Sequence, residues 1–374
     1  MVALKGLQRK RSRIGLDIGA AGVRAVQLTR SADGYVIANA AHGDRPRTAE
    51  QDSADLHPLA TDIEECIRRA SFRGKAVAAA LASPDVEFHT LELPAAALRS
   101  DEAETAQIVR FEVERLMSGS QAPVETRHWA LPETTVPAPS AIGAGAAHES
   151  INRTIEACVE AGLTCADLDT SATALCRFGA VLHRWAKDQV WGMLDVGDRQ
   201  TRLVLCLDAR RDRGGSVETV LVRTTGPGGR AWTQRVADAL QLSFKAAEIH
   251  KRDHGIALTG RLNRTPAEEG ARSELASLIL GALRADLNEI AAEVKRSYEY
   301  VLSCYPGRQA GDLVLCGGGS ALRNLPEFLT NALGIPVRRA STYLDDPSCR
   351  LQLGTDRKAP LEVLAVAVGL AVTE

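Results

Sequence analysis

The chain has 374 residues, of which 45% are apolar and 25% are charged, and its formal net charge is -2. This composition is typical of a globular protein, and the length favours two domains. A near-neutral charge argues against nucleic acid as the main partner, because neutralising a phosphate backbone requires clustered Lys and Arg. No stretch approaches the roughly 20 apolar residues that span a bilayer, so we expect no membrane-spanning helix.

The eight cysteines show no C-x-x-C spacing and no paired framework. Most of them lie in apolar stretches, where a thiol behaves as a small hydrophobic group. We therefore expect a reducing, cytoplasmic compartment. The basic residues 1–13 lack the apolar core of a secretory signal. They predict a solvated tail, with contact to an anionic membrane face as the alternative.

The first half of the chain begins with an alternation of apolar and polar residues over 14–40, which predicts a hairpin followed by a third strand. Residues 62–72 have helical spacing, and residues 76–82 are typical of a buried strand. A Pro-rich stretch at 130–140 indicates a loop. A strand and then a helix are expected after it, up to residue 163.

Residues 100–117 predict a further helix in this half. Ser100 is a suitable N-cap, although Ala103 stands where a full capping box would have Glu or Gln. Acidic residues in the first turn favour a helix N-terminus as well. The apolar face is predicted to consist of Ala106, Val109, Val113 and Leu116.

The second half has the same order of elements. Residues 191–208 predict a strand, a Gly-containing turn and a strand, and residues 217–229 include a third strand. Residues 272–303 predict a long helix with one apolar stripe, formed by Leu275, Ile279, Leu283, Leu287, Ile290, Val294, Tyr298 and Val301. Residues 312–335 predict a buried strand, three glycines and a helix, and residues 361–372 a buried helix. The two halves therefore indicate a duplicated α/β architecture.

Two turns carry the residues of a candidate phosphate site. A Gly-rich turn can direct several backbone N–H groups at one phosphate, because no Cβ blocks the approach. An acidic residue at the end of a strand can hold Mg²⁺ through waters. The first turn contributes Asp17, Gly19, Ala20, Ala21, Gly22 and Arg24, and the second contributes Asp195, Gly197, Asp198 and Thr201. Each turn alone is common in ordinary hairpins.

A third glycine element follows the last long strand, at Gly317, Gly318 and Gly319. Glycine there permits close approach of a ligand, and a helix N-terminus after it would favour an anion or a flat base. A tight strand-to-helix turn is the simpler interpretation of this element alone. The three elements together indicate a nucleotide site, although neither a P-loop nor G-x-G-x-x-G before a helix is present.

The order of two D-x-G hairpins, "GPGG" and a late "GGG" resembles the actin/sugar-kinase/heat-shock ATPase superfamily. Longer stretches narrow the resemblance to the type IV pilus assembly protein PilM family, which is close to the cell-division protein FtsA. These stretches are residues 13–30, 90–117, 226–255, 294–302 and 313–337. The resemblance covers nearly the whole chain.

The resemblance implies an α/β, actin-like (ribonuclease H-like) fold with duplicated domains around a nucleotide cleft and a small FtsA-like inserted subdomain. Domain I would comprise residues 1–186, with the inserted subdomain at about 87–140 and the C-terminal helix, 361–374, packing back on it. Domain II would comprise residues 187–360.

The resemblance also implies binding of ATP and Mg²⁺. Asp17 and Asp195 would hold the metal through water, and the two turns would form the first and second phosphate loops, with Arg24 where many relatives have Lys. Gly228 and Gly229 would approach the phosphates or ribose, Glu248 and Lys251 would border the adenosine, and Gly317, Gly318 and Gly319 would lie against the base or ribose. Ala20 and Ala21 depart from the usual hydroxyl residues, which leaves only backbone contacts to a phosphate there.

The partner implied by the family is a PilN-like inner-membrane protein, whose short cytoplasmic N-terminal peptide would dock beside the inserted subdomain, near residues 91–117. The protein would then be cytoplasmic and reach the membrane only through its partners, with self-association as a further expectation. Residues 118–125 depart from the Pro-apolar stretch that the family usually has after this segment.

The sequence does not indicate a catalytic residue. Asp167 and Asp169 could act as bases, but carboxylates before a helix are more often caps. We therefore expect ATP binding with weak or no ATPase activity; a sugar or acid kinase of the same fold and an FtsA-like filament are the alternatives. His250 and His254 stand four apart on a predicted helix without a third ligand, so two solvated histidines are expected there.

Overall fold

The computed structural model describes residues 11–45, 56–81, 85–94, 102–117, 123–208, 217–258, 266–354 and 359–372. Its contacts divide the chain into two compact units, which are described separately. The first comprises Met1–Val86, Ala146–Arg184 and Tyr343–Glu374, and the second comprises Glu87–Gly145 and Trp185–Thr342. None of the helices in these described ranges is both long and apolar enough to cross a membrane.

The first unit contains a six-stranded sheet in the order β14-β3-β2-β1-β4-β8. Strands β1 to β3 form an antiparallel meander, and β4 and β8 continue the sheet in parallel with β1. This confirms the predicted hairpin and third strand. The bounds are β1 Arg11–Gly19, β2 Gly22–Arg30, β3 Tyr35–Asp44, β4 Ala76–Leu81, β8 Thr164–Thr170 and β14 Leu351–Leu353.

The predicted solvated tail is wrong for Arg11–Arg13, which belong to β1, and its residues 1–10 lie outside the described residues. Strand pairing holds this end of β1. Leu28 N donates to Ser12 Oγ at 2.9 Å, and Gln27 Nε2 donates to Ser12 O at 3.0 Å. Side chain–backbone bonds, with the pairing of Arg11 to Thr29 across a register shift, thus extend the strand beyond the point where apolar alternation begins.

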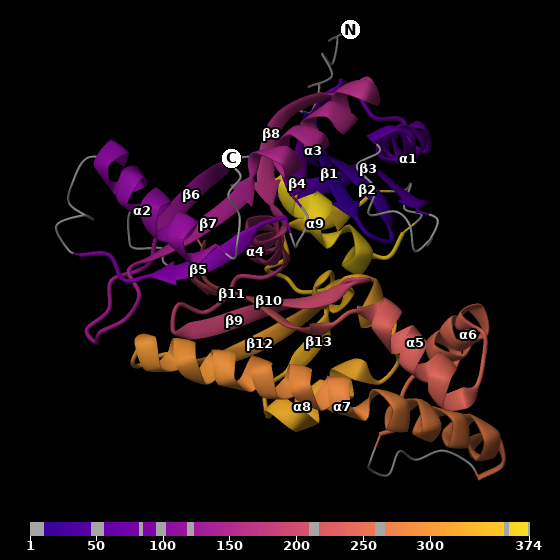
Figure 1. The fold of residues 1–374 in the computed structure, drawn as a ribbon. Helices are drawn as coiled ribbons and strands as arrows, with labels where there is room; N and C mark the ends of the chain where they lie inside the picture. The colour runs from indigo at the N-terminus through magenta and orange to yellow at the C-terminus, as the bar shows by residue number, and fades with distance from the viewer. Residues whose placement is uncertain are drawn as a thin grey trace, which may run out of the picture. The chain divides into compact units, whose positions relative to one another are not determined.

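The helices of the first unit are α1 Leu56–Arg68, α3 His148–Glu160, α4 Ser171–Leu182 and α9 Leu361–Ala371. Figure 1 shows α9 against β1 and β2, and its contacts are with these strands and with α4. Two glycines permit this packing: a Cβ on Gly15 would overlap the α9 backbone, and a Cβ on Gly369 would overlap Ala174 O of α4. Helix α9 is almost entirely buried, as its apolar sequence predicts.

The second unit repeats the same strand arrangement in a five-stranded sheet, in the order β11-β10-β9-β12-β13. Strands β9 to β11 are an antiparallel meander, and β12 and β13 run parallel to β9. Each strand therefore has a counterpart among β1, β2, β3, β4 and β8. The bounds are β9 Gln189–Val196, β10 Gln200–Asp208, β11 Val217–Pro227, β12 Gln309–Cys316 and β13 Val337–Arg339.

Outside the insert described below, the helices and 3-10 turns described in the second unit are α5 Gly229–Leu240, α6 Phe244–His254, α7 Pro266–Cys304, α8 Leu325–Leu333, η2 Gly318–Ala321 and η3 Ala340–Tyr343. Helix α7, orange in Figure 1, packs along β11 and β10. Its predicted stripe is confirmed, since all eight residues except the half-buried Leu275 are buried. A periodic stripe on a long helix must face the core, so sequence alone identifies it.

An insert of three strands and one helix lies between β4 and α3. It consists of β5 Glu87–Leu91, α2 Glu102–Leu116, β6 Val124–Ala130 and β7 Ala141–Ala147, with the sheet order β5-β7-β6. The Ser100 cap lies outside the described residues. The predicted face is right for Val109 and Val113 but wrong for Ala106 and Leu116, which are exposed. The reason is that the side of α2 that lies over Gly143 and Gly145 of β7 carries Val109, Val113 and Met117.

The insert has its contacts within the second unit, whereas the sequence placed it in domain I. Trp129 Nε1 donates to Thr219 O of β11 at 2.8 Å, and Thr134 Oγ1 donates to Cys304 O of α7 at 2.5 Å. Leu131 and Ala138 pack against the apolar core around α7. Together these contacts tie the segment after β6 to the second sheet.

Candidate functional site

The first predicted phosphate loop is the turn between β1 and β2. Asp17 and Arg24 are paired across the hairpin, and Arg24 Nη1 lies 3.6 Å from Asp17 Oδ2. The same Nη1 atom donates to Gly22 O at 3.1 Å, and a Cβ on Gly19 would overlap it. Both charged side chains are largely buried. The guanidinium is therefore held over the turn that Ala20 and Ala21 complete.

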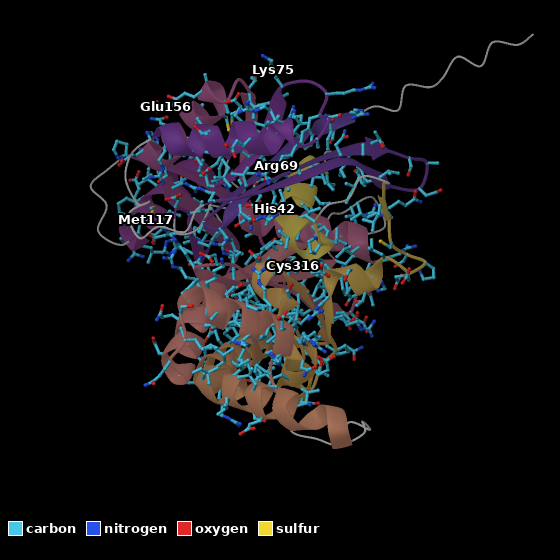
Figure 2. The ribbon with its side chains drawn as sticks, turned by 90° about the vertical axis from the view of Figure 1, so that its right-hand side faces the viewer. His42, Arg69, Lys75, Met117, Glu156 and Cys316 are labelled. Carbon is cyan, nitrogen blue, oxygen red and sulfur yellow. The ribbon has the colours of Figure 1, made fainter. Side chains whose placement is uncertain are left out.

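Further cationic groups lie beside this turn in the same unit. Arg69, which follows α1, donates from Nη1 to His42 O of β3 at 2.9 Å. Both residues are labelled in Figure 2. Burial lowers the pKa of His42, and the charges of Arg24 and Arg69 lower it further, while Asp44 acts in the opposite direction. Arg24, Arg69, Asp17 and Asp44 thus bring charges of both signs to the first loop and its neighbour His42.

The second predicted phosphate loop, between β9 and β10, is bonded to the start of α5. Gly228 N donates to Arg199 O at 3.0 Å, Gly229 N donates to Gly197 O at 2.8 Å, and Arg230 N donates to Asp198 O at 2.9 Å. A Cβ on Gly228 would lie 2.5 Å from Asp198 O. The "GPGG" glycines therefore allow two backbone segments to meet, and the loop satisfies N–H groups that a helix N-terminus leaves open.

Thr201, predicted as part of this loop, is fully buried in β10. Its Oγ1 donates to Pro227 O at 2.7 Å, so the hydroxyl joins β10 to β11 instead of pointing outward. Asp195 is placed differently: it is the last residue but one of β9 and pairs in register with Cys316 of β12. Its carboxylate therefore stands where the carboxyl ends of two parallel strands meet, the usual place for ligands in such sheets.

The triple glycine lies directly beside Asp195. Gly317 has a φ of +78°, which favours glycine, and a Cβ there would overlap Asp195 Oδ1 and Val196 O. Gly319 is similarly close to Val196, but Gly318 has nothing within 4 Å of a built Cβ. Among the three, only a Cβ on Gly318 would point into open space.

The helix predicted to follow these glycines does not begin there. Residues 318–321 form a 3-10 turn closed by Ser320, whose Oγ donates to Gly317 O at 2.7 Å. Helix α8 begins only at Leu325, after Asn324 in the left-handed region. Asn324 Nδ2 donates to Ile256 O at 2.7 Å, and this tertiary bond holds the intervening turn. Bare backbone, without a helix N-terminus, therefore faces the position at Gly318.

Glu248 and Lys251 lie on α6 and bond to α5. Lys251 Nζ lies 2.7 Å from Glu248 Oε2, 2.6 Å from Thr233 Oγ1 and 2.9 Å from Gly229 O. Burial alone would raise the pKa of Glu248, but Lys251, Thr233 and Arg252 together lower it to about 2. Thr233 was not predicted from sequence; its position four residues after Gly229 on α5 was the available signal.

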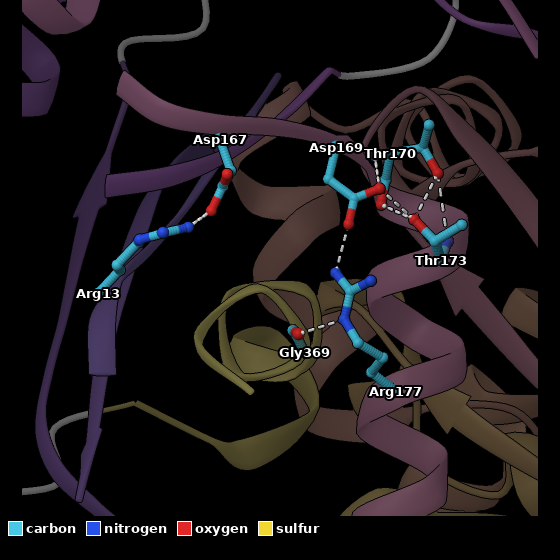
Figure 3. Close-up of polar contacts among 7 residues, drawn as sticks. All are labelled: Arg13, Asp167, Asp169, Thr170, Thr173, Arg177 and Gly369. Atoms are coloured by element: carbon cyan, nitrogen blue, oxygen red, sulfur yellow. Dashed lines mark hydrogen bonds and ion pairs between the residues drawn. The ribbon is translucent and has the colours of Figure 1, made fainter. Parts of the chain in front are cut away.

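The two acidic residues before α4 are both ion-paired (Figure 3). Asp169 Oδ1 accepts from Thr170 N at 2.6 Å and from Thr173 Oγ1 at 2.5 Å, and Asp169 Oδ2 pairs with Arg177 at 2.5 Å. Asp167 pairs with Arg13. Thr170 is the N-cap of α4, and Asp169 supports it. The arrangement favours a structural role at this helix start over that of a base.

His250 and His254 on α6 have ring centroids 5.7 Å apart. Within the described ranges, no group of three His, Cys, Asp or Glu side chains could hold a metal ion. Of the predicted site residues, the second unit contains Asp195, Gly197, Asp198, Thr201, Gly228, Gly229, Glu248, Lys251, Gly317, Gly318 and Gly319. The first unit contains Asp17, Gly19, Ala20, Ala21, Gly22 and Arg24.

The chain is similar to known proteins over most of its length. The sequence profile of the family described as type IV pilus assembly protein PilM matches residues 15–260. A solved structure of a PilM-PilN type IV pilus biogenesis complex contains a chain that is 26% identical, with a TM-score of 0.72; the match covers 96% of this chain and 97% of that chain. No curated protein matches the chain.

Two crystal structures with lower identity also match. Ethanolamine utilization protein EutJ from Carboxydothermus hydrogenoformans is 14% identical with a TM-score of 0.51, covering 98% of this chain and 90% of that chain. MreB 5 of Spiroplasma citri, bound to AMPPNP, is 13% identical with a TM-score of 0.49, covering 96% and 95%.

The two sheets share one strand order, and each begins with a hairpin whose first strand carries an Asp near its end. These features define an actin-like α/β protein, as the structural match to the PilM-PilN chain indicates. The family profile covers well over half of the sequence. The chain belongs to the type IV pilus assembly protein PilM family.

Proposed function

We propose that this chain is a nucleotide-binding assembly scaffold of a type IV pilus or related secretion machine. It acts in the cytoplasm and reaches the inner membrane through the cytoplasmic N-terminal peptide of a PilN-like partner. The observation that carries this proposal is the near full-length match to a chain of a PilM-PilN complex, together with family membership. Association with further copies of itself is part of the same proposal.

The arrangement around Asp195 supports nucleotide binding in the second unit. Asp195 lies next to the end of β9, which pairs in parallel with β12; a Cβ on Gly317 would overlap its Oδ1, and a Cβ on Gly318 would meet nothing within 4 Å. A carboxylate at such a strand end would hold Mg²⁺ through waters, and the ion would supply positive charge for the phosphates. In the first unit, Asp17 would serve the metal in the same way and Arg24 would contact phosphate. ATP with Mg²⁺ is the proposed ligand.

Binding without efficient hydrolysis is the proposed chemistry. Hydrolysis requires a group that orients or deprotonates the attacking water. The candidate bases Asp167 and Asp169 each pair with an arginine, and Asp169 also accepts two hydrogen bonds at the start of α4. These contacts support a structural role for both carboxylates, so they favour the scaffold over a small-molecule kinase.

The nucleotide site is tested with Gly318→Ala. Because a Cβ at Gly318 meets nothing within 4 Å, the variant should fold with wild-type stability while the added methyl group occupies ligand space. We expect ATP affinity, measured by calorimetry with Mg²⁺, to fall at least tenfold. Gly281→Ala is the matched control, since a Cβ there, on α7, is also unobstructed. Wild-type affinity in both variants would remove Gly318 from the site.

The partner surface is tested on α2. Phe111 is 65% exposed on the side of α2 opposite Val109 and Val113, and exposed aromatic residues often anchor interfaces. Phe111→Ser should reduce binding of a fluorescent PilN-like N-terminal peptide at least tenfold, measured by anisotropy. Leu278→Ser is the control, because Leu278 is 50% exposed on α7. Equal binding by both variants would place the peptide away from the outer face of α2.

A further inference from the structure

The chain turns back sharply between α3 and β8 in the first unit. Gly162, with a φ of +75°, donates from its N to Val159 O at 2.9 Å, and Leu163 N donates to Cys158 O at 2.9 Å. This pair of bonds is the Schellman motif, which ends a helix and satisfies carbonyl groups of its last turn. Cys158 therefore belongs to the last turn of α3, and Cys165 is the second residue of the strand that follows.

Cys165 points to the side of the first sheet that α3 covers. It pairs in register with Val77 of β4, and neighbouring residues of paired strands point to the same face. Val77 and Cys158 are fully buried in one apolar cluster, and Cys165 packs against that cluster. The two cysteine side chains, one from a helix and one from a strand, therefore lie on the same side of the sheet.

The two thiols are hydrogen-bonded to each other, and the Cys158 thiol donates to the Cys165 sulfur. This bond and burial raise the pKa of Cys158, whereas the bond lowers the pKa of Cys165 against the opposing effect of burial. The thiolate and not the thiol is the nucleophilic form of cysteine. The half-buried Cys165 is thus the more easily ionised of the two, and the fully buried Cys158 keeps its proton beside it.

Cys349 is the natural comparison within the same unit. Cys165 and Cys349 are half-buried, whereas the other six cysteines are buried. Each donates from Sγ to the carbonyl two residues later, Cys165 to Asp167 O at 3.5 Å and Cys349 to Leu351 O at 3.4 Å. Burial raises the pKa of Cys349, whereas that of Cys165 is lowered. The hydrogen bond from Cys158 therefore sets Cys165 apart.

We propose that Cys165 and Cys158 form a thiol oxidation site, at which a peroxide oxidises Cys165 and Cys158 then closes an intramolecular disulfide with it. An accessible thiolate beside a second cysteine is the arrangement of a reversible redox site. In a reducing compartment such a disulfide is transient, because cellular thiols reduce it again. This inference depends neither on nucleotide binding nor on the partner peptide, and it is tested separately from both.

The reaction balances with hydrogen peroxide as the oxidant. The Cys165 thiolate attacks one peroxide oxygen, the O–O bond breaks, and the departing hydroxide takes a proton to become water. Cys165 is then a sulfenic acid. The Cys158 thiol gives up its proton, an S–S bond forms to Cys165, and the S–O bond breaks with release of a second water. The two sulfurs together lose two electrons, which reduce the peroxide.

The disulfide is detected by mass spectrometry on the reduced full chain after addition of hydrogen peroxide. Glu160 lies between the two cysteines, so digestion with trypsin and a glutamate-specific protease leaves two peptides joined only by the new bond. We expect a Cys158–Cys165 link that disappears with dithiothreitol, while Cys349 keeps its thiol. The absence of a link, or a link from Cys158 to Cys176 instead, would overturn the inference.

The order of the two steps is tested with Cys158→Ser, which keeps a hydroxyl donor beside Cys165. Without the second thiol, Cys165 should stop at the sulfenic acid, which dimedone traps. Cys165→Ser should give no trapped product at Cys158, because Cys158 is not the thiol that meets the peroxide. Trapping at Cys158 in Cys165→Ser, or no trapping at Cys165 in Cys158→Ser, contradicts the proposed roles.

A measurement on the unmodified chain keeps the proposal testable if Cys158→Ser does not fold, which circular dichroism reveals. At pH 7, iodoacetamide should alkylate Cys165 about tenfold faster than Cys349, as the thiolate fractions of the two require. Equal rates would contradict the proposed reactivity of Cys165. Cys349→Ser is the matched control variant: it removes the other half-buried thiol and should leave the yield of the Cys158–Cys165 disulfide unchanged, and a lower yield would count against the site.

Discussion

The two hairpins that open the two sheets share a topology but hold their turns by different means. In the first unit, Asp17 faces the Arg24 side chain across the hairpin. In the second, Asp195 adjoins the backbone of Gly317, and the turn after β9 is bonded to the start of α5. One hairpin thus relies on a charged side chain and the other on close backbone packing. A duplicated fold preserves strand order, while the chemistry of each loop depends on its own neighbours.

The largest expected effect concerns backbone packing in the second loop. Gly228→Ala would place a Cβ 2.5 Å from Asp198 O, whereas a Cβ on Gly229 would have its nearest neighbour at 3.7 Å. We expect Gly228→Ala to lower the free energy of unfolding by about 3 kcal/mol, as an overpacked site does. Gly229→Ala should change it by less than about 0.5 kcal/mol. Chemical denaturation measures both, and equal losses would contradict the described packing.

The next effect is the pH dependence of the network behind that loop. The pKa of Glu248 is about 2, below its usual value of 4.5, so the ionised carboxylate stabilises the folded state above pH 5. This contribution is lost as the pH falls towards 2. Between pH 7 and pH 3 it should amount to about 2 kcal/mol of unfolding free energy.

The measurement is denaturant unfolding at both pH values. Glu248→Gln cannot titrate, so the variant should lose less stability than the wild type over this range. An identical pH dependence in wild type and variant would contradict the assignment of this contribution to Glu248.

A smaller effect is expected from the side chain that holds the first loop. Arg24→Gln removes the pair with Asp17 and the bond to Gly22 O, and leaves a largely buried carboxylate without its cation. The expected loss of unfolding free energy is about 1–2 kcal/mol. Arg30→Gln, at the end of the same strand, is the control. A loss as small as that of the control would mean that backbone pairing alone holds this hairpin.

The smallest effect is on a neighbouring histidine. Arg24 is one of the charges that lower the pKa of His42, after burial. In Arg24→Gln, the pKa of His42 should rise towards its ordinary value, which an NMR titration of the ring protons detects. An unchanged titration would place the guanidinium farther from His42 than the structure does.

The sequence predicted the regular elements well because their periodicity reflects burial directly. The alternation over 14–40 identified β1 to β3, and the stripe from Leu275 to Val301 identified the buried face of α7. The sequence-based prediction was wrong where a neighbouring element determines which face of a helix is buried. Ala106 and Leu116 fit an apolar stripe on α2, but Gly143 and Gly145 of β7 determine that Val113 points inward.

For the candidate site, too, the sequence predicted some features and the tertiary structure determined others. The sequence alone located the glycine turns and their acidic residues, because such residues are recognisable by type and spacing. Only the tertiary structure decided that Thr201 is bonded to Pro227, that Lys251 is engaged by Gly229 and Thr233, and that Gly318 is the open glycine. A residue's type determines which bonds it can form, but the packing of distant strands and helices determines which partners come within reach.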